Sequence, residues 1–233
     1  AGGDVADHVG VHDTGREAAL VLVPTTAGTG SDGQASAIVS DAETHRKLAC
    51  LAPGLGADVV LLDPTLTLSC PRAVTAASGL DALTHAVEVA VTTRRGPESD
   101  ALATSAFVAI EAALPRVLAT PADLDARAAM LEASHEAGLA IAHSMLGAAH
   151  AAGNALTARY GVAHGLAVSQ MLPAVVRHNA EESEAAARYA ALAAAAGLAP
   201  SAEALAARLD ALVALAGTTS QVIEADIPAL AAE

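Results

Sequence analysis

Alanine is the residue that most restricts what this chain can fold into. It makes up roughly a quarter of the 233 residues, whereas the chain holds one Phe, two Tyr and no Trp. Any core must therefore be built from Ala, Leu, Val and Ile. Because alanine is the best helix former, such a composition favours a mainly helical protein with closely packed helices.

The charge balance argues against two classes of partner. The formal net charge is -14, and the only lysine is Lys47. Nucleic acids and anionic membranes both attract basic surfaces, so we expect neither as a partner. No uncharged apolar run is long enough to span a bilayer and no signal peptide is recognisable, which makes the cytoplasm the simplest compartment. Cys50 and Cys70 are too few for a disulfide framework and are expected to be buried thiols.

Strand signals and helix signals fall in different parts of the chain. Residues 1–18 show no convincing periodicity. Four strands are expected, at 19–23, 35–40, 47–51 and 58–62, with a turn at 41–44 joining the middle two into a hairpin. Helices are expected near 72–91, 99–117, 123–142, 144–158, 165–178, 181–196 and 201–216. The predicted fold is mainly α, with an all-helical domain at 65–233 preceded by the last strands of an α/β domain at 1–64.

An aspartate and a histidine stand at a spacing that a metal site could use. Asp81 and His85 are four residues apart in Gly79–Glu88, which is expected to be helical. Positions i and i+4 lie above one another on a helix face, so this carboxylate and imidazole can reach one divalent cation. An ordinary hydrogen-bonded pair is the alternative interpretation.

Two further histidines fit the same site. His150 falls in the middle of an apolar helical segment, where an imidazole without a partner is costly to bury, and a metal ion would satisfy it. His164 precedes Gly165 at an expected helix start. With Asp81 and His85 they form a set of three nitrogens and one oxygen, which suits Fe(II) or Zn(II) better than Mg²⁺ or Ca²⁺.

A loop of small residues follows the first expected strand. Residues 24–31 combine hydroxylated side chains with glycines. Hydroxyls and free backbone N–H groups in such a loop can approach a nucleotide closely and donate to its ribose or phosphates. A plain turn is the alternative interpretation.

Taken in order along the chain, these motifs resemble the iron-containing (group III) alcohol dehydrogenases. The resemblance runs from about residue 19 to the end, and its most specific element is Gly79–Glu88. The matching segments are Val23–Ser31, Lys47, Asp63–Pro64, Gly79–Glu88, Gly147–His150, His164–Gly165 and Leu172–Pro173.

The resemblance implies a metal-dependent oxidoreductase. One Fe(II), or Zn(II), would bind the oxygen of a small alcohol or aldehyde while a hydride passes to or from NAD(P). Residues 1–64 would be a remnant of the nucleotide-binding domain, and 65–233 the metal-binding domain. The implied metal ligands are Asp81, His85, His150 and His164, of which His150 and His164 are also the expected catalytic residues. The implied cofactor-binding residues are Thr25, Thr26, Thr29, Ser31 and Lys47.

Three features depart from the family pattern. The family usually carries a second histidine one helical turn after the position of His150, where this chain has Asn154, whose amide cannot act as a general base. His143, one heptad before His150, is expected to face roughly the same way and is a candidate stand-in, with a structural role as the alternative. Asp32–Gly33 replaces the glutamate that continues the loop motif. A Gly-Gly-Gly-Ser phosphate-binding turn has no counterpart in residues 1–18, so most of the nucleotide-binding domain is expected to be missing.

Other functions stay open beside the dehydrogenase. A truncated relative with an intact metal site but no nicotinamide cofactor would act as a metal-dependent lyase or hydrolase, or as a non-catalytic metal-binding domain. The resemblance also suggests a homodimer, which is common in the family. The scarcity of aromatics suggests an aliphatic substrate pocket around Leu83, Val87, Met145 and Leu146. The other histidines are expected to be surface or capping residues: His8, His12, His45, His135 and His178.

Overall fold

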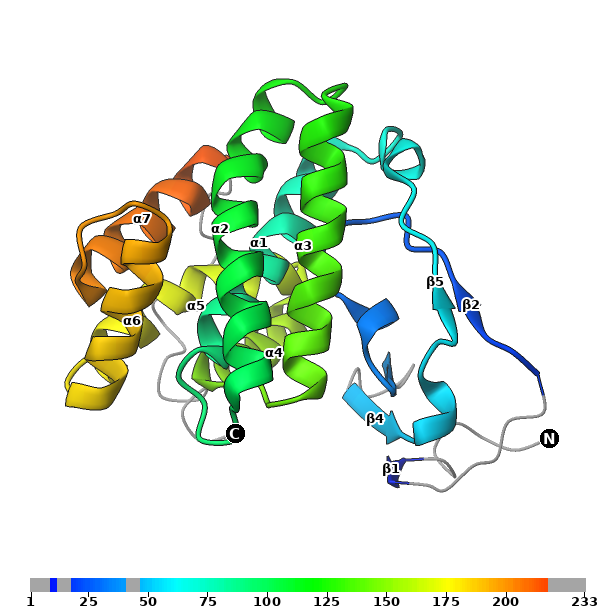
Figure 1. Ribbon diagram of the computed structural model, residues 1–233, viewed down its shortest axis with the longest axis horizontal. Coiled ribbons are helices and arrows are strands. Elements are labelled where there is room, and N and C mark those ends of the chain that lie inside the picture. The colour runs from blue at the N-terminus through cyan, green and yellow to red at the C-terminus, as the bar shows by residue number, and fades with distance from the viewer. Residues whose placement is uncertain (1–8, 12–17, 41–46, 218–233) are drawn as a thin grey trace.

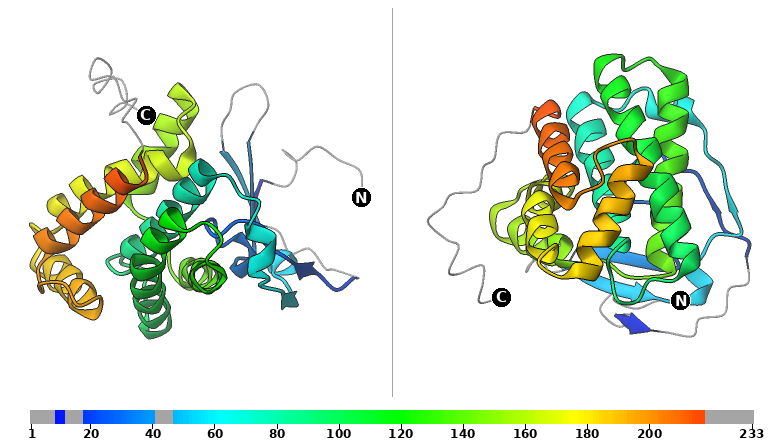
Figure 2. Two further views of the ribbon diagram at one scale, coloured as in Figure 1. Left: turned by 90° about the horizontal axis from the view of Figure 1, so that it is seen from above. Right: turned by 60° about the vertical axis from the view of Figure 1, so that its left-hand side comes forward.

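The computed structural model describes residues 9–11, 18–40 and 47–217 of the chain. This part is mainly α, as predicted: seven helices pack together, and short strands lie to one side of them (Figures 1 and 2). The helices are α1 (Arg72–Val89), α2 (Pro97–Ala119), α3 (Leu124–Ala142), α4 (Ala148–Tyr160), α5 (His164–Asn179), α6 (Ser183–Ala195) and α7 (Ala202–Leu215). Each expected helical segment is therefore a helix, with ends that differ by a few residues.

Five short strands form two small sheets within the described ranges. In the first sheet, β3 (Ser36–Ser40) and β4 (Lys47–Leu51) form the expected antiparallel hairpin. In the same sheet β1 (Gly10–Val11) pairs parallel with β4, although its segment shows no periodicity. In the second, β2 (Val21–Leu22) runs parallel to β5 (Val59–Val60). The turn predicted at 41–44 lies outside the described residues.

The core is built around α1. Every residue of α1 over Gly79–Val89 is buried, because α2, α3 and α5 all pack against this helix. Ala76 and Ala82 are fully buried at 0% exposure, so their small side chains let the neighbouring helices come close. The aromatic side chains of Phe107 and Tyr189 complete a core that is otherwise aliphatic.

Helix α2 is long and apolar, yet it is not an uncharged run. Of the described helices, it alone could cross a membrane by length and composition. The helix reaches this length because it includes charged residues such as Asp100 and Glu111. Its apolar face, including Ala103, Phe107 and Ile110, is buried, and α1 and α3 are its main packing partners. In this structure α2 is a core helix of the bundle.

Helix α4 starts at Ala148, later than predicted, because a residue of another helix caps it. Glu88 of α1 accepts hydrogen bonds from the backbone N–H groups of Ala149 (2.6 Å) and His150 (3.3 Å). His143 consequently ends α3 instead of lying on one helix with His150, and its side chain is 47% exposed. The two histidines therefore share no helix face, contrary to the sequence interpretation.

The two cysteines differ in burial. Both are free thiols, and Cys50 is buried in β4 as predicted. Cys70 is partly exposed, because it lies in the turn that leads into α1 rather than in a strand.

Candidate metal centre

Three histidines converge on one aspartate. The Nε2 atoms of His85, His150 and His164 lie 3.5, 3.5 and 3.6 Å from Oδ1 of Asp81. One ligand atom from each of Asp81, His150 and His164 forms a group whose members lie within 4.8 Å of one another. The ring of His85 stacks on that of His150, with centroids 4.8 Å apart. The structure therefore brings together all four residues for which the sequence predicts a metal site.

Three helices supply these side chains. Helix α1 supplies Asp81 and, one turn later, the first histidine, while His150 comes from the first turn of α4 and His164 begins α5. The start of α5 can approach α1 because the next residue is Gly165. A Cβ at Gly165 would overlap the carbonyl oxygen of Ala77 and would lie 3.1 Å from the Cβ of Asp81. Only glycine at this position lets His164 reach the cluster.

A second carboxylate orients His150. Glu88 is 3% exposed, and its Oε2 accepts a hydrogen bond from His150 Nδ1 (2.5 Å). This bond places a proton on Nδ1 and turns Nε2 toward Asp81, where Nε2 offers a lone pair whenever it is not itself protonated. A carboxylate at this place is the usual second partner of a metal-ligating imidazole. Its position two helical turns after Asp81 is the sequence signal that could have identified Glu88 in this role.

Burial and neighbouring charges set the protonation of the cluster. Burial lowers the pKa of His85 to about 4, so this imidazole is neutral near pH 7. Burial also disfavours charge on His150, but the neighbouring carboxylate of Asp81 and the hydrogen bond to Glu88 outweigh burial and raise its pKa to about 9. Burial raises the pKa of both carboxylates, but other contacts outweigh it and bring each pKa below its ordinary value. For Asp81 these contacts are the three histidines, and for Glu88 they are His150 and backbone N–H groups at the start of α4. Two ionised carboxylates thus lie inside the bundle, and the protonated His150 balances only one of their charges.

These residues fit a divalent transition metal. Among the described residues, Asp81 Oδ1 and His150 Nε2 are buried without a hydrogen-bond partner, which is costly unless another group binds them. A divalent cation would balance the charges of Asp81 and Glu88. Imidazole nitrogens with one carboxylate oxygen suit Fe(II) or Zn(II) better than Mg²⁺ or Ca²⁺.

The cluster opens toward solvent on the side of His164. That side chain is 33% exposed, against 3–5% for the three other residues. Asn154, one turn after His150 on α4, is also exposed. Leu83 and Val87, expected to line a substrate pocket, belong to the closed core instead. A small molecule would therefore reach the cluster past His164.

The predicted cofactor loop contacts the helix that carries the cluster. A Cβ at Gly28 would lie 2.5 Å from the Cβ of Ser78, which precedes Asp81 by one turn of α1. Gly165 at the start of α5 contacts the adjacent Ala77. The loop and the start of α5 thus meet α1 at neighbouring residues.

Most of the predicted cofactor-binding side chains are accessible. Thr25, Thr29 and Ser31 are exposed and Thr26 is partly buried. The Thr29 hydroxyl donates to Ser31 Oγ (3.1 Å), so these two hydroxyls lie together. Lys47 begins β4, opposite Ser40 of β3.

Among the remaining histidines, His135 differs from the surface or capping residue that the sequence predicts. It is 21% exposed and its Nδ1 lies 2.6 Å from Oδ2 of Asp32, a partner 103 residues away that no sequence pattern connects to it. His178 is 80% exposed, as expected. His8, His12 and His45 lie outside the described residues.

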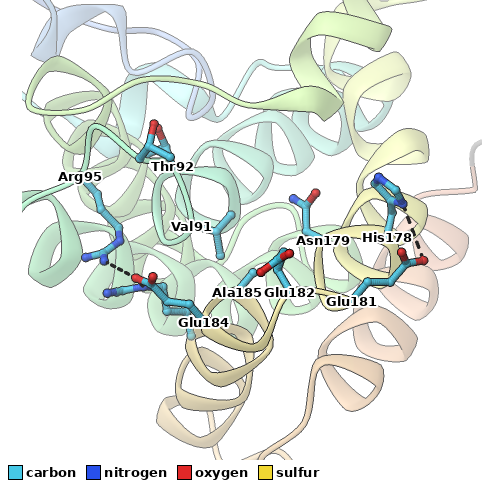
Figure 3. Close-up of a pocket in the computed structure, with 11 residues that line it drawn as sticks. Val91, Thr92, Arg95, His178, Asn179, Glu181, Glu182, Glu184 and Ala185 are labelled. Carbon is cyan, nitrogen blue, oxygen red and sulfur yellow. Dashed lines mark hydrogen bonds and ion pairs between the residues drawn. The ribbon is translucent and has the colours of Figure 1, made fainter.

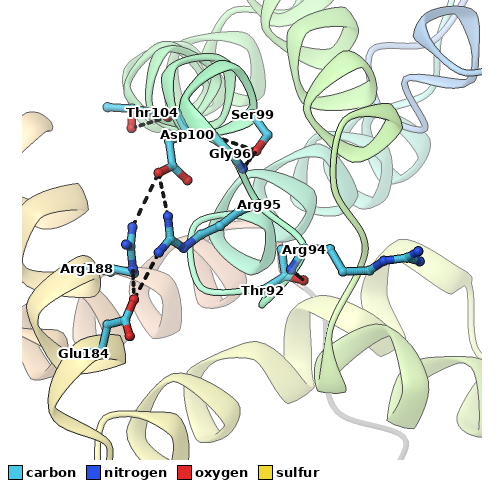
Figure 4. A network of polar contacts seen from close by, with 9 residues as sticks. All are labelled: Thr92, Arg94, Arg95, Gly96, Ser99, Asp100, Thr104, Glu184 and Arg188. Carbon is cyan, nitrogen blue, oxygen red and sulfur yellow. Dashed lines mark hydrogen bonds and ion pairs between the residues drawn. The ribbon is translucent and has the colours of Figure 1, made fainter.

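A cavity of about 700 Å³ lies away from the cluster of Asp81 and the three histidines. It is bounded by the segment after α1, the end of α5 and the start of α6 (Figure 3). Arg95 and Arg188 beside it are each bonded to Asp100 and Glu184, at 2.9–3.4 Å (Figure 4). The two arginines in the wall of this cavity are therefore already paired with carboxylates.

Comparison with known proteins assigns the family. Residues 2–64 match the family "Iron-containing alcohol dehydrogenase", and residues 75–231 match "Fe-containing alcohol dehydrogenase family, C-terminal". The chain therefore belongs to the iron-containing alcohol dehydrogenases, which confirms the resemblance seen in its motifs. The match begins well before residue 19, where the motif resemblance starts.

Individual relatives carry related names. The chain is 38% identical over 180 residues to 1-propanol dehydrogenase PduQ of Citrobacter freundii, which covers 77% of this chain and 49% of that protein. It is 40% identical over 160 residues to the probable alcohol dehydrogenase EutG of Escherichia coli, which covers 69% of this chain and 40% of that protein. The chain thus spans at most about half the length of these curated relatives.

Solved structures share the fold. A 1,3-propanediol oxidoreductase superposes with a TM-score of 0.89 at 32% identity, covering 100% of this chain and 64% of that chain. The sulfoacetaldehyde reductase from Bifidobacterium kashiwanohense, solved in complex with NAD+, gives a TM-score of 0.88 at 28% identity and covers 99% of this chain and 62% of that chain.

Proposed function

We propose that this protein is a metal-dependent oxidoreductase that transfers a hydride between a small alcohol or aldehyde and NAD(P). One observation carries the proposal: in a member of this family, three imidazole Nε2 atoms meet at Asp81 Oδ1 within 3.6 Å. Asp81, His85, His150 and His164 would hold one Fe(II) or Zn(II), and His150 and His164 would serve in catalysis through it.

The chain's own residues prepare the site for a substrate. When bound, the metal supplies Lewis acidity toward the substrate oxygen, which lowers the pKa of an alcohol or polarises an aldehyde. Glu88 holds the His150 ring so that Nε2 faces the cluster. The burial of Asp81 and His85 excludes water from the closed side, and the partly exposed His164 leaves one side open. Since Asn154 cannot act as a general base, the alcohol proton would leave through water or a substrate group.

The cofactor would lie along the loop at 24–31. The exposed hydroxyls of Thr25, Thr29 and Ser31 support this assignment, as does the contact of Gly28 with α1 one turn from Asp81. Thr26 and Lys47 are proposed as further contacts. We also propose the division into residues 1–64, which carry this loop, and residues 65–233, which carry the metal ligands.

The test measures nicotinamide absorbance with the intact gene product, loaded with Fe(II) or Zn(II) under argon. NAD(H) and NADP(H) are offered with a panel of short alcohols and aldehydes. We expect metal-dependent turnover, lost together with metal content in Asp81→Ala and His150→Ala. Asp125→Ala and His178→Ala, which alter exposed residues of the same types, should keep both.

Each failure has a distinct meaning. Metal binding without dinucleotide binding would refute the dehydrogenase and favour a lyase, a hydrolase or a non-catalytic metal-binding domain. Unchanged metal content in both Asp81→Ala and His150→Ala would refute the site itself.

A cytoplasmic location and a homodimer complete the proposal. The first is the expectation from the sequence, and the family resemblance supports the second. Cell fractionation and the molar mass in solution test them; a membrane-bound protein or a strict monomer would contradict them.

A further inference from the structure

The loop at 24–31 leads directly into a segment that packs on α3. This segment is the short 3₁₀ helix η2 (Ser31–Gly33). Gly30 before it has φ 57°, and a Cβ there would lie 2.6 Å from the Cα of Gly138. A Cβ at Gly33 would lie 2.9 Å from the backbone nitrogen of Leu139. The loop therefore touches α3 backbone to backbone, with no room for a side chain at either glycine.

Asp32 of η2 and His135 of α3 form a side-chain pair at the same contact between the loop and α3. Asp32 Oδ2 lies 2.6 Å from His135 Nδ1, with side-chain exposures of 8% and 21%. A carboxylate buried to this degree needs a hydrogen-bonding partner, and His135 supplies it. Gln34 fixes the loop internally, because its Nε2 donates to the carbonyl oxygens of Thr29 and Gly30 (both 3.3 Å).

We infer that Asp32 and His135 are positioning residues that fix the cofactor loop against α3. This inference rests on the proposed function, because it takes the loop to be the dinucleotide site. Neither residue needs to touch the dinucleotide. They hold Ser31, the neighbour of Asp32, and through it Thr29, whose hydroxyl bonds Ser31 Oγ. A loop of small residues buries little apolar surface, so a polar anchor is what keeps it ordered before the cofactor arrives.

The inference is tested with Asp32→Asn, His135→Gln and the double variant. We expect each single change to weaken the binding of NADH or NADPH about 10-fold, because a charged, partly buried hydrogen bond is lost. The double variant should bind no more weakly than the single variants, since both changes break one interaction. KM for the dinucleotide should rise while kcat and metal content change little, and amide hydrogen exchange should accelerate at residues 25–33.

Glu203→Gln is the matched control. It also removes one negative charge from an ion pair between elements, here with Arg177 at 2.9 Å, but lies between α5 and α7. Dinucleotide affinity and loop exchange should equal those of the wild type. If Asp32→Asn fails to fold, His135→Gln decides the question, because His135 is the more exposed partner.

The outcomes separate the inference from the proposed function. Folded variants with wild-type dinucleotide affinity and wild-type loop exchange would overturn the inference. Additive losses in the double variant would overturn the pairing. A wild-type protein that binds no dinucleotide would refute the proposed cofactor and, with it, the role of this pair in cofactor positioning. Faster amide hydrogen exchange in the variants would then show that the pair is a purely structural anchor.

Discussion

At the scale of single residues, Glu88 links the cluster of Asp81 and the three histidines to the backbone of α4. One carboxylate oxygen accepts from the backbone N–H of Ala149 and the other from His150 Nδ1. An amide has only one acceptor oxygen, so glutamine cannot reproduce both bonds. Glu88 therefore sets both where α4 begins and how the His150 ring is oriented.

Replacing Glu88 by Gln should weaken metal binding without removing a proposed ligand. We expect the affinity for Zn(II) or Fe(II) to fall about 10- to 100-fold, because the ring of His150 loses its orienting partner. Competition with a chelator of known affinity measures the change. Glu184→Gln, whose side chain is 76% exposed, serves as control and should leave the affinity unaltered. Equal affinity of Glu88→Gln and the wild type would contradict this role.

The contacts of the site that could be predicted from the sequence are those between residues that are near each other in the chain. Asp81 and His85 share a helix face at i,i+4, so their proximity follows from helix geometry alone. The pair of Asp32 and His135 spans 103 residues and depends on how η2 packs against α3. His143 was misplaced because the capping of α4 by a residue of α1 separates the two helices.

At the scale of elements, the approach of α5 to α1 depends on Gly165. A Cβ there would overlap the carbonyl oxygen of Ala77, which lies in the helix backbone and cannot rotate away. The start of α5 carries His164, so any displacement of this helix moves a proposed metal ligand.

We expect Gly165→Ala to lower the free energy of unfolding by about 1–3 kcal/mol and to weaken metal binding, because overpacking pushes α5 from α1. Urea denaturation and chelator competition measure the two effects. Gly96→Ala is the control, since a Cβ at Gly96 meets nothing within 4 Å. A Gly165→Ala variant as stable as Gly96→Ala would show that α5 has room to move.

Helix boundaries were predictable where glycine or proline sets them. Gly161, with φ 66°, ends α4 where the sequence places a break. The start of α4 was not predictable, because the acceptor for its first N–H groups comes from Glu88 of another helix. Strand β1 is two residues long and is defined only by its pairing with β4, so no local pattern could reveal it.

At the scale of the whole molecule, the strands and the helices meet at the proposed site. Gly28 packs on Ser78 of α1, and Gly30 packs on Gly138 of α3. The loop is thereby held between the helix that carries Asp81 and the helix that carries His135. The proposed cofactor loop and the proposed metal ligands thus form one unit in a chain whose core is mostly alanine, leucine and valine.

Removing the metal should destabilise the whole molecule. Without a metal ion, only the protonated His150 balances the two buried carboxylates. A ligand present at 1,000 times its Kd contributes about 4 kcal/mol to stability. We therefore expect a chelator to lower the thermal midpoint of the wild type and to leave that of His150→Ala unchanged. An equal shift in both proteins would place the stabilising metal elsewhere.

The central claim is that Asp81, His85, His150 and His164 hold one metal ion. Anomalous diffraction at the iron edge from crystals of the Fe(II)-loaded protein tests it most directly. The predicted result is one strong peak in contact with all four side chains, at about 2.0–2.2 Å from the imidazole nitrogens and the carboxylate oxygen. A map with no peak among these side chains, or with the ion bound to other residues, would contradict it.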